Sequence, residues 1–187
     1  MVQAPYQALS LAEFLQLPET KPAREYIDGQ IIQKPMPKGK HSVIQGELVP
    51  AINGILKPQR IARAFPELRC TFGERSIVPD IAVFLWERIP RDENGEVANT
   101  FLMAPDWTIE ILSPEQKQTK VIKNILYCFR HETQMGWLID PDEQTVLVYR
   151  PQQEPLVLDQ PDDTIPAPPF AKELHLTINT LFTWLWE

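Results

Sequence analysis

A short apolar run with one acid near its centre constrains this sequence more than any other feature. Residues 107–112 read WTIEIL and are bounded by Pro105 and Pro114. The β-branched and aromatic residues of this run are typical of a buried strand. A carboxylate inside such a strand is costly to desolvate unless it is paired, hydrogen-bonded or bound to a metal. Glu110 therefore requires a compensating partner.

A second acid stands in a similar setting upstream. Residues 76–85 read SIVPDIAVFL, so Asp80 lies inside an apolar, strand-like stretch and directly follows Pro79. Two buried acids on neighbouring strands repel each other unless a cation lies between them. Asp80 and Glu110 are therefore predicted to belong to one site.

The segment after the second of these strands has helical periodicity. Apolar residues recur at helical spacing between 116 and 130 and form a stripe that can pack on a sheet. Lys123 and Tyr127 lie one turn apart and off this stripe. We therefore expect Asp80, Glu110 and Lys123 to converge at one end of the sheet.

The order of the other elements predicts the fold class. Asp28-Gly29 between two apolar segments is a strong hairpin signal, and a helix is expected from His41 to Leu56. The strand at 107–112, the following helix and a strand at 137–140 form a crossover, which favours parallel pairing of the two strands. We therefore expect an α/β (α+β) fold with a central mixed β-sheet flanked by helices.

Length and composition indicate a single domain over residues 1–187. The chain is 43% hydrophobic, which is enough for one core. Within it we expect a flexible N-terminus at 1–9, an irregular proline-rich arm at 151–172 and a C-terminal helix at 177–186. Because no apolar segment is long enough to cross a bilayer, we predict a cytoplasmic protein without membrane contact.

The net charge of −7 is unusual for a protein that binds nucleic acid. Such binding relies on Lys and Arg residues that neutralise phosphates. The charges are unevenly distributed, because many basic residues precede Asp80 whereas acids concentrate at 92–96 and 154–163. A local basic face and a merely scattered, solvated set of charges are both compatible with this distribution.

Taken together, the motifs resemble those of the Uma-type family of bacterial endonucleases, whose fold belongs to the PD-(D/E)XK restriction-endonuclease-like superfamily. Each motif is short, but their order and spacing extend over most of the chain. The matching residues are Glu25-Tyr26-Ile27-Asp28-Gly29, His41, Val78-Pro79-Asp80, Glu110-Ile111-Leu112-Ser113-Pro114, Lys123 with Tyr127, and Trp137-Leu138-Ile139-Asp140-Pro141.

This resemblance implies a metal-dependent endonuclease. Asp80 and Glu110 would bind a divalent metal, Mg²⁺ or Mn²⁺, with help from the main-chain carbonyl of Ile111. The metal would lower the pKa of a bound water, and Lys123 would stabilise the developing anion. The substrate would be a nucleic acid, with DNA expected, and the protein would act as a homodimer.

The same resemblance gives roles to three further residues. Glu25 is expected to join the catalytic set, and His41 and Tyr127 are expected to contact the substrate. Simpler interpretations stay open. Glu25 can be an exposed acid beside a turn, His41 can cap a helix or lie at the surface, and Tyr127 can pack on the sheet with its hydroxyl at the rim. For Lys123 the alternative is a solvated helix face. For Asp80 and Glu110 the alternative is a pair of acids satisfied by backbone amides or by a lysine.

Two positions depart from the family pattern and leave other functions open. Leu112 stands where the superfamily carries its lysine, so Lys123 must substitute from the helix, and Thr119 stands where many relatives carry an aspartate. The alternative function is a catalytically weak or inactive nuclease-fold module that binds nucleic acid or a protein partner. A third is an enzyme that acts on another substrate through a two-acid metal site.

Overall fold

The computed structural model describes residues 9–114 and 116–187, so the N-terminal segment expected to be flexible, apart from Leu9, lies outside the described residues. The described helices are α1 (Leu11–Phe14), α2 (Gly39–Leu56), α3 (Gln118–Phe129) and α4 (Ile178–Thr183). The described strands are β1 (Arg24–Ile27), β2 (Gln30–Gln33), β3 (Ala62–Pro66), β4 (Cys70–Phe72), β5 (Arg75–Ile77), β6 (Ile81–Leu85), β7 (Trp107–Ile111), β8 (Met135–Asp140), β9 (Thr145–Tyr149) and β10 (Leu156–Leu158).

The larger sheet is mixed and has β7 in its interior. Its strand order is β10-β9-β8-β7-β6-β3. β7 and β8 are parallel and are joined through α3, whereas the other neighbouring pairs are antiparallel. The predicted crossover, the central position of the Glu110 strand and the mixed-sheet fold class are confirmed.

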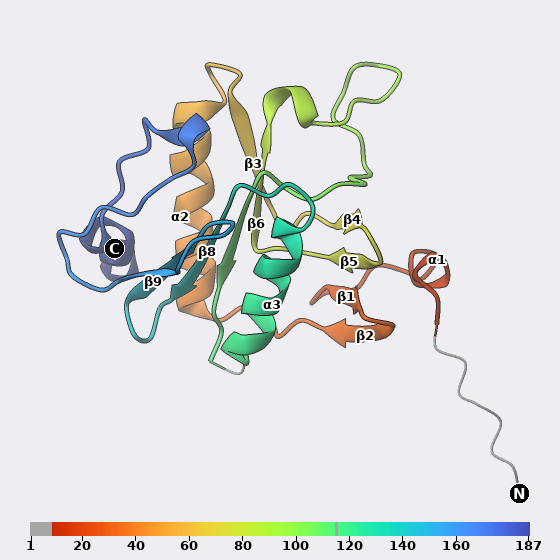
Figure 1. Cartoon of the computed structure of the whole chain (residues 1–187), viewed down its shortest axis with the longest axis horizontal. Coiled ribbons are helices and arrows are strands. Elements are labelled where there is room, and N and C mark those ends of the chain that lie inside the picture. The colour runs from red at the N-terminus through yellow and green to blue at the C-terminus, as the bar shows by residue number, and fades with distance from the viewer. Residues whose placement is uncertain (1–8, 115) are drawn as a thin grey trace, which may run out of the picture.

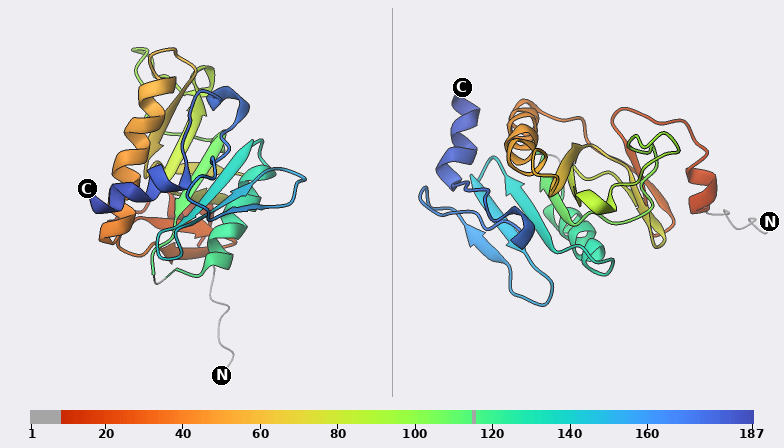
Figure 2. Two further views of the ribbon diagram at one scale, coloured as in Figure 1. Left: turned by 90° about the vertical axis from the view of Figure 1, so that its left-hand side faces the viewer. Right: turned by 90° about the horizontal axis from the view of Figure 1, so that it is seen from above.

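The two long helices cover opposite faces of this sheet (Figures 1 and 2). Side chains alternate between the faces along each strand. In β7, Trp107, Ile109 and Ile111 therefore join the large core that includes the buried residues of α2. Glu110 points to the opposite face, where Val121 of α3 belongs to a second cluster. This alternation places the acid on the α3 face of an otherwise apolar strand.

A smaller sheet stands beside the first and contains the β1–β2 and β4–β5 hairpins. Its order is β2-β1-β5-β4, and β1 and β2 pair across the predicted Asp28-Gly29 turn. The strand expected across residues 76–85 is instead divided: β5 belongs to the smaller sheet and β6 to the larger one. The expectation of one continuous strand was wrong because Pro79, which lacks an N–H for a sheet ladder, lies at the crossing point.

The C-terminal part folds back onto α2 (Figure 2). The proline-rich stretch 151–172 contains β10, and Pro166 accepts a hydrogen bond from the Trp137 indole. α4 continues into a 3₁₀ turn at Trp184–Trp186, in which the Trp186 side chain is 83% exposed. No described helix is both long enough and apolar enough to cross a membrane.

Candidate active site

The two acids selected from the sequence lie next to each other between the sheets. Ile81 of β6 pairs with Ile109 of β7, so the antiparallel register brings Asp80 beside Glu110. Both side chains are buried. The backbone N–H of Ile111 donates a hydrogen bond of 2.7 Å to Asp80 Oδ2. Asp80 therefore has a fixed orientation at the point where the chain passes from one sheet to the other.

The lysine that contacts these acids is Lys34, which is not among the site residues predicted from the sequence. Its Nζ lies 2.7 Å from Asp80 Oδ1, 3.8 Å from Glu110 Oε2 and 2.6 Å from the carbonyl oxygen of Val78. The Lys34 side chain is only 12% exposed. A single ammonium group thus occupies the space between the two acids.

The β1–β2 hairpin delivers Lys34 together with Glu25. In an antiparallel pair, residues opposite each other share a face, and alternate residues along a strand do too. Glu25 pairs with Ile32, and the Lys34 amide bonds to the Ala23 carbonyl, so Glu25 and Lys34 occupy one face of the hairpin. Glu25 is buried and accepts a hydrogen bond of 2.8 Å from the Val78 N–H. The pairing across the Asp28-Gly29 turn sets this register, which is the signal that could have drawn attention to Lys34.

His41 contacts Asp80 from the first turn of α2. Its Nε2 lies 3.1 Å from Asp80 Oδ2, and the imidazole is buried. One turn further along the same helix, the Gln45 amide donates to the main-chain oxygen of Asp80. His41 Nδ1 is buried and has no hydrogen-bond partner among the described residues. The predicted substrate contact of His41 remains a prediction, while the structure places this residue against the carboxylate.

The acids of the site have opposite titration behaviour. Burial raises the pKa of Glu110 well above its ordinary range, and repulsion from Asp80 and Glu25 adds to this effect. Burial likewise raises the pKa of Glu25. Burial would also raise the pKa of Asp80, but the charge of Lys34 and the hydrogen bond from His41 outweigh it and lower that pKa. Asp80 is therefore the acid that carries the negative charge most firmly.

Lys34 stays protonated despite its burial. Burial alone would lower its pKa, but the nearby charges of Asp80, Glu110 and Glu25 raise it above the ordinary value. Three buried carboxyl groups thus surround one ammonium group. This excess of buried acids explains why the pKa values of Glu110 and Glu25 are raised.

The oxygen atoms around Lys34 fit a hard divalent cation. No set of three or more His, Cys, Asp or Glu side chains is arranged to hold a metal within residues 9–114 and 116–187. The site offers instead two carboxylates and the Val78 carbonyl, all within 3.8 Å of one cationic nitrogen. Oxygen ligands of this kind suit Mg²⁺ or Mn²⁺, which usually retain several waters and need few protein ligands.

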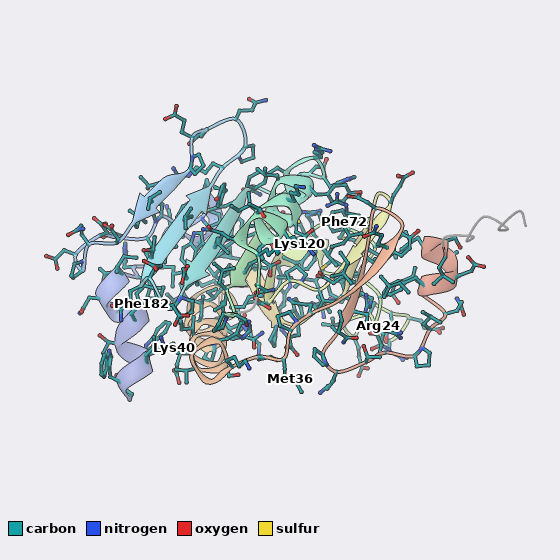
Figure 3. All side chains as sticks on the ribbon, turned by 90° about the horizontal axis from the view of Figure 1, so that it is seen from below. Arg24, Met36, Lys40, Phe72, Lys120 and Phe182 are labelled. Atoms are coloured by element: carbon teal, nitrogen blue, oxygen red, sulfur yellow. The ribbon has the colours of Figure 1, made fainter. Side chains whose placement is uncertain are left out.

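A cleft of about 610 Å³ lies between the hairpin and α3, and Glu25 and Lys34 line it. Lys117, Lys120 and Lys123 line the α3 side, and Lys120 is labelled on this helix in Figure 3. The Lys123 side chain is exposed and forms no hydrogen bond or ion pair with other described residues. The structure therefore places it at the cleft wall and not in contact with the acids. The other lining residues are Ile27, Asp28, Gln30, Ile32, Gln33, Pro35, Arg75, Gln116, Val121 and Asn124.

Tyr127 lies further along α3, at the turn between β4 and β5. Its hydroxyl accepts a hydrogen bond from the Glu74 N–H, its ring stacks on Phe72, and the Arg75 guanidinium lies 4.0 Å from the ring centre. These contacts match the simpler interpretation of a ring packed at the sheet rim. A substrate contact of Tyr127 is still an untested prediction.

With this geometry established, comparison with known proteins identifies the family. The family model described as "Putative restriction endonuclease", named Uma2, matches residues 11–179. The chain belongs to the Uma2 family. The resemblance drawn from the sequence motifs is thereby confirmed, and the Uma2 match includes every candidate site residue. A search of curated proteins found no significant match.

A solved structure supports the fold of this Uma2 chain. The protein of Anabaena variabilis ATCC 29413 described as "a putative nuclease belonging to DUF820" is 72% identical in sequence. The match covers 94% of this chain and 98% of that chain, with a TM-score of 0.93. The restriction-endonuclease-like fold class predicted from the sequence is confirmed at this level of similarity.

Proposed function

We propose that this Uma2 protein is a metal-dependent endonuclease that hydrolyses phosphodiester bonds of nucleic acids through a PD-(D/E)XK-type site. The observation that carries the proposal is the burial of Asp80 and Glu110 around the Lys34 ammonium group, because Lys34 also lines the cleft that contains Lys117, Lys120 and Lys123. Family membership supports nuclease activity in general. DNA is the expected substrate.

Asp80 and Glu110 would hold Mg²⁺ or Mn²⁺ with help from the Ile111 carbonyl, as the resemblance implies, and the Val78 carbonyl beside Lys34 is a further oxygen available at the site. The metal, when bound, supplies an activated water and charge neutralisation for the transition state. The chain fixes the acids beforehand: the Ile111 N–H and His41 Nε2 orient Asp80, and β7 orients Glu110. Such preorganisation removes the need to reorder the ligands during the reaction.

The cleft residues would hold and polarise the phosphate backbone. Lys117, at the N-cap of α3, is followed at three-residue intervals by Lys120 and Lys123, and the helical rise separates the last two by about 4.5 Å along the helix axis. A row of ammonium groups can neutralise adjacent phosphates, although the whole chain has a net charge of −7. Lys123 and Lys34 both line the cleft from which a scissile phosphate would approach the acids. Either can stabilise charge that develops on its oxygens.

A cleavage assay tests the proposal. Plasmid, linear duplex and single-stranded DNA are incubated with purified protein and Mg²⁺ or Mn²⁺. Asp80→Ala and Glu110→Ala are expected to lower the cleavage rate by at least about 100-fold. Glu154→Ala, which removes an exposed acid far along the chain, serves as the control and should retain wild-type activity. Equal activity of all three variants would reject the proposed site.

The alternative function is a module that binds nucleic acid or a protein partner without cutting. Two observations favour it: Leu112 stands where the superfamily carries its lysine, and Lys34 pairs with Asp80 at 2.7 Å and lies 3.8 Å from Glu110. Wild-type protein that binds labelled DNA or RNA but cuts neither with Mg²⁺ nor with Mn²⁺ would establish this alternative. Absence of both binding and cleavage would favour an enzyme with another substrate.

The proposal extends to the oligomeric state and the cellular location of the protein. We expect a homodimer because the exposed Trp186 lies in a C-terminal turn with other apolar residues. Sedimentation that gives only monomer across micromolar concentrations would exclude it. A cytoplasmic location agrees with two free, buried cysteines, Cys70 and Cys128.

A further inference from the structure

The ammonium group of Lys34 has the surroundings expected of a bound metal ion. It contacts oxygen atoms only, from one carboxylate and one main-chain carbonyl at hydrogen-bonding distance, with the second carboxylate at 3.8 Å. No acidic partner of Lys34 outside the site is found among the described ion pairs. Its position between the acids is therefore the position in which a divalent cation would touch both.

We propose that Lys34 is an internal counter-cation of the metal-free site, and that a divalent cation binds only when the Lys34 side chain leaves the acids and turns into the lysine-lined cleft. This inference rests on the proposed metal site. It adds that metal binding and Lys34 compete for the same oxygen atoms, and it makes Lys34 the lysine that metal binding delivers to the substrate phosphate.

The space around the acids is too small for the Lys34 ammonium group and a hydrated divalent cation to bind there together. The free volume beside Asp80 and His41 is about 20 Å³, which is close to the ~10–15 Å³ needed for one water molecule. A hydrated divalent cation does not fit there while the ammonium group stays. Lys34 also lines the 610 Å³ cleft, which has room for the displaced side chain. Four methylene groups give lysine the reach and freedom for this movement.

Charge also favours the exchange. A divalent cation brings twice the charge of the ammonium group to a site that contains three buried carboxyl groups. Asp80 would retain His41 Nε2 and the Ile111 N–H after Lys34 leaves, so its orientation would survive. The released ammonium group would lie in the cleft together with Lys123, where a phosphate can pair with it.

The exchange predicts that Lys34 weakens metal binding. Lys34→Met removes the competing ammonium group but retains a long apolar side chain. Lys123→Met is the matched control, since it removes a positive charge that lines the same cleft without contacting the acids. In calorimetric titrations at mildly alkaline pH, Lys34→Met should bind Mn²⁺ at least about tenfold more tightly than wild type, and Lys123→Met within about threefold.

A second measurement uses the wild-type protein and decides the question if Lys34→Met does not fold. Brief acetylation with acetic anhydride, followed by peptide mass spectrometry, measures how accessible each lysine is. Lys34 should react slowly without metal and several-fold faster with saturating Mn²⁺. Lys123 should react rapidly in both states, because it is exposed.

The outcomes separate this inference from the proposed function. If Mn²⁺ binds to wild type and Lys34→Met equally well, or if acetylation of Lys34 does not respond to Mn²⁺, the exchange is overturned and the metal site survives. If neither protein binds Mn²⁺, the proposed metal site fails and the exchange fails with it. Tighter binding by Lys34→Met alone, with metal-dependent exposure of Lys34, supports it.

Discussion

Neutralising the two neighbouring acids is expected to change stability in opposite directions. The variants are Asp80→Asn and Glu110→Gln, studied without metal. Both acids are buried and both face Lys34, so a simple view of paired negative charge predicts that either replacement stabilises the protein. Their surroundings predict otherwise, because Asp80 is held in its charged form whereas Glu110 is not.

The magnitude for Asp80→Asn follows from its contacts. At 2.7 Å from Lys34, the Coulomb attraction is about 6 kcal/mol with an effective dielectric constant of about 20. Relief of the carboxylate's desolvation offsets part of this, and removing one partner of a buried pair generally costs about 3–5 kcal/mol. Because the Asp80 pKa is lowered, this stabilisation is present above the unfolded pKa and is lost only as the pH falls through the folded value. The stability that Asp80→Asn loses relative to wild type should therefore be constant between about pH 5 and pH 8.

Glu110→Gln should show the opposite sign and a pH dependence. The attraction to Lys34 at 3.8 Å is about 4 kcal/mol on the same scale. Burial and repulsion outweigh it, because they raise the Glu110 pKa. An acid with a raised folded pKa destabilises the fold progressively as the pH rises above its unfolded value. The variant should thus match wild type near pH 4 and become progressively more stable than wild type as the pH rises toward 8.

Urea unfolding, followed by fluorescence of the buried Trp107 and Trp137, measures both effects in buffer with EDTA. Repeating each curve at several pH values distinguishes the pH-independent loss of stability in Asp80→Asn from the gain in Glu110→Gln, which increases with pH. The reasoning is refuted if both variants lose stability to the same extent, or if the effect of Glu110→Gln does not change with pH.

Three further predictions test other parts of the structure. Lys120→Ala should reduce the slope of log affinity against log salt by about 0.9 for duplex DNA or about 0.7 for single strands, without a change in thermal stability. Gly73→Ala should lower the free energy of unfolding in urea by about 1–3 kcal/mol, because Gly73 has φ 56° and an added Cβ meets the Tyr127 hydroxyl. The control, Gly46→Ala in the middle of α2, adds a Cβ with no atom within 4 Å and should raise the free energy of unfolding by about 0.5–1 kcal/mol. Cys70, whose pKa burial raises to about 12, should not react with a thiol reagent until the protein unfolds.

The sequence was sufficient for the fold where local signals agree with tertiary packing. The Asp28-Gly29 turn fixed the β1–β2 hairpin, and the apolar stripe of 116–130 predicted α3 on the sheet. The helix between the two strands makes a crossover connection, and this predicted the parallel β7–β8 pair. The division of 76–85 into two sheets was missed because both halves are equally apolar, and periodicity alone does not show which sheet a strand joins.

The sequence predicts Asp80 and Glu110 as site residues but does not predict Lys34, and each outcome has a physical reason. Glu110 and Asp80 conflict with their apolar surroundings, so burial itself marks them in the sequence. Lys34 follows the short strand β2 and precedes a proline-rich loop, where a lysine is ordinarily solvated. Only the hairpin register reveals that Lys34 shares a face with Glu25. Lys123 was preferred because the family pattern pointed to the helix, and the structure places it on the cleft wall.

The break between the two sheets and the charged face of the hairpin depend on each other. Where the chain crosses at Pro79, the main-chain groups of Val78 leave the regular ladder and require partners, because buried unpaired backbone groups are costly. The hairpin supplies both: Glu25 accepts from the Val78 N–H, and Lys34 donates to the Val78 carbonyl. Lys34 in turn neutralises Asp80, the residue that the break presents to the site. A substitution at Glu25 or Lys34 should therefore disturb the junction of the two sheets as well as the acids, which makes the hairpin a structural part of the site.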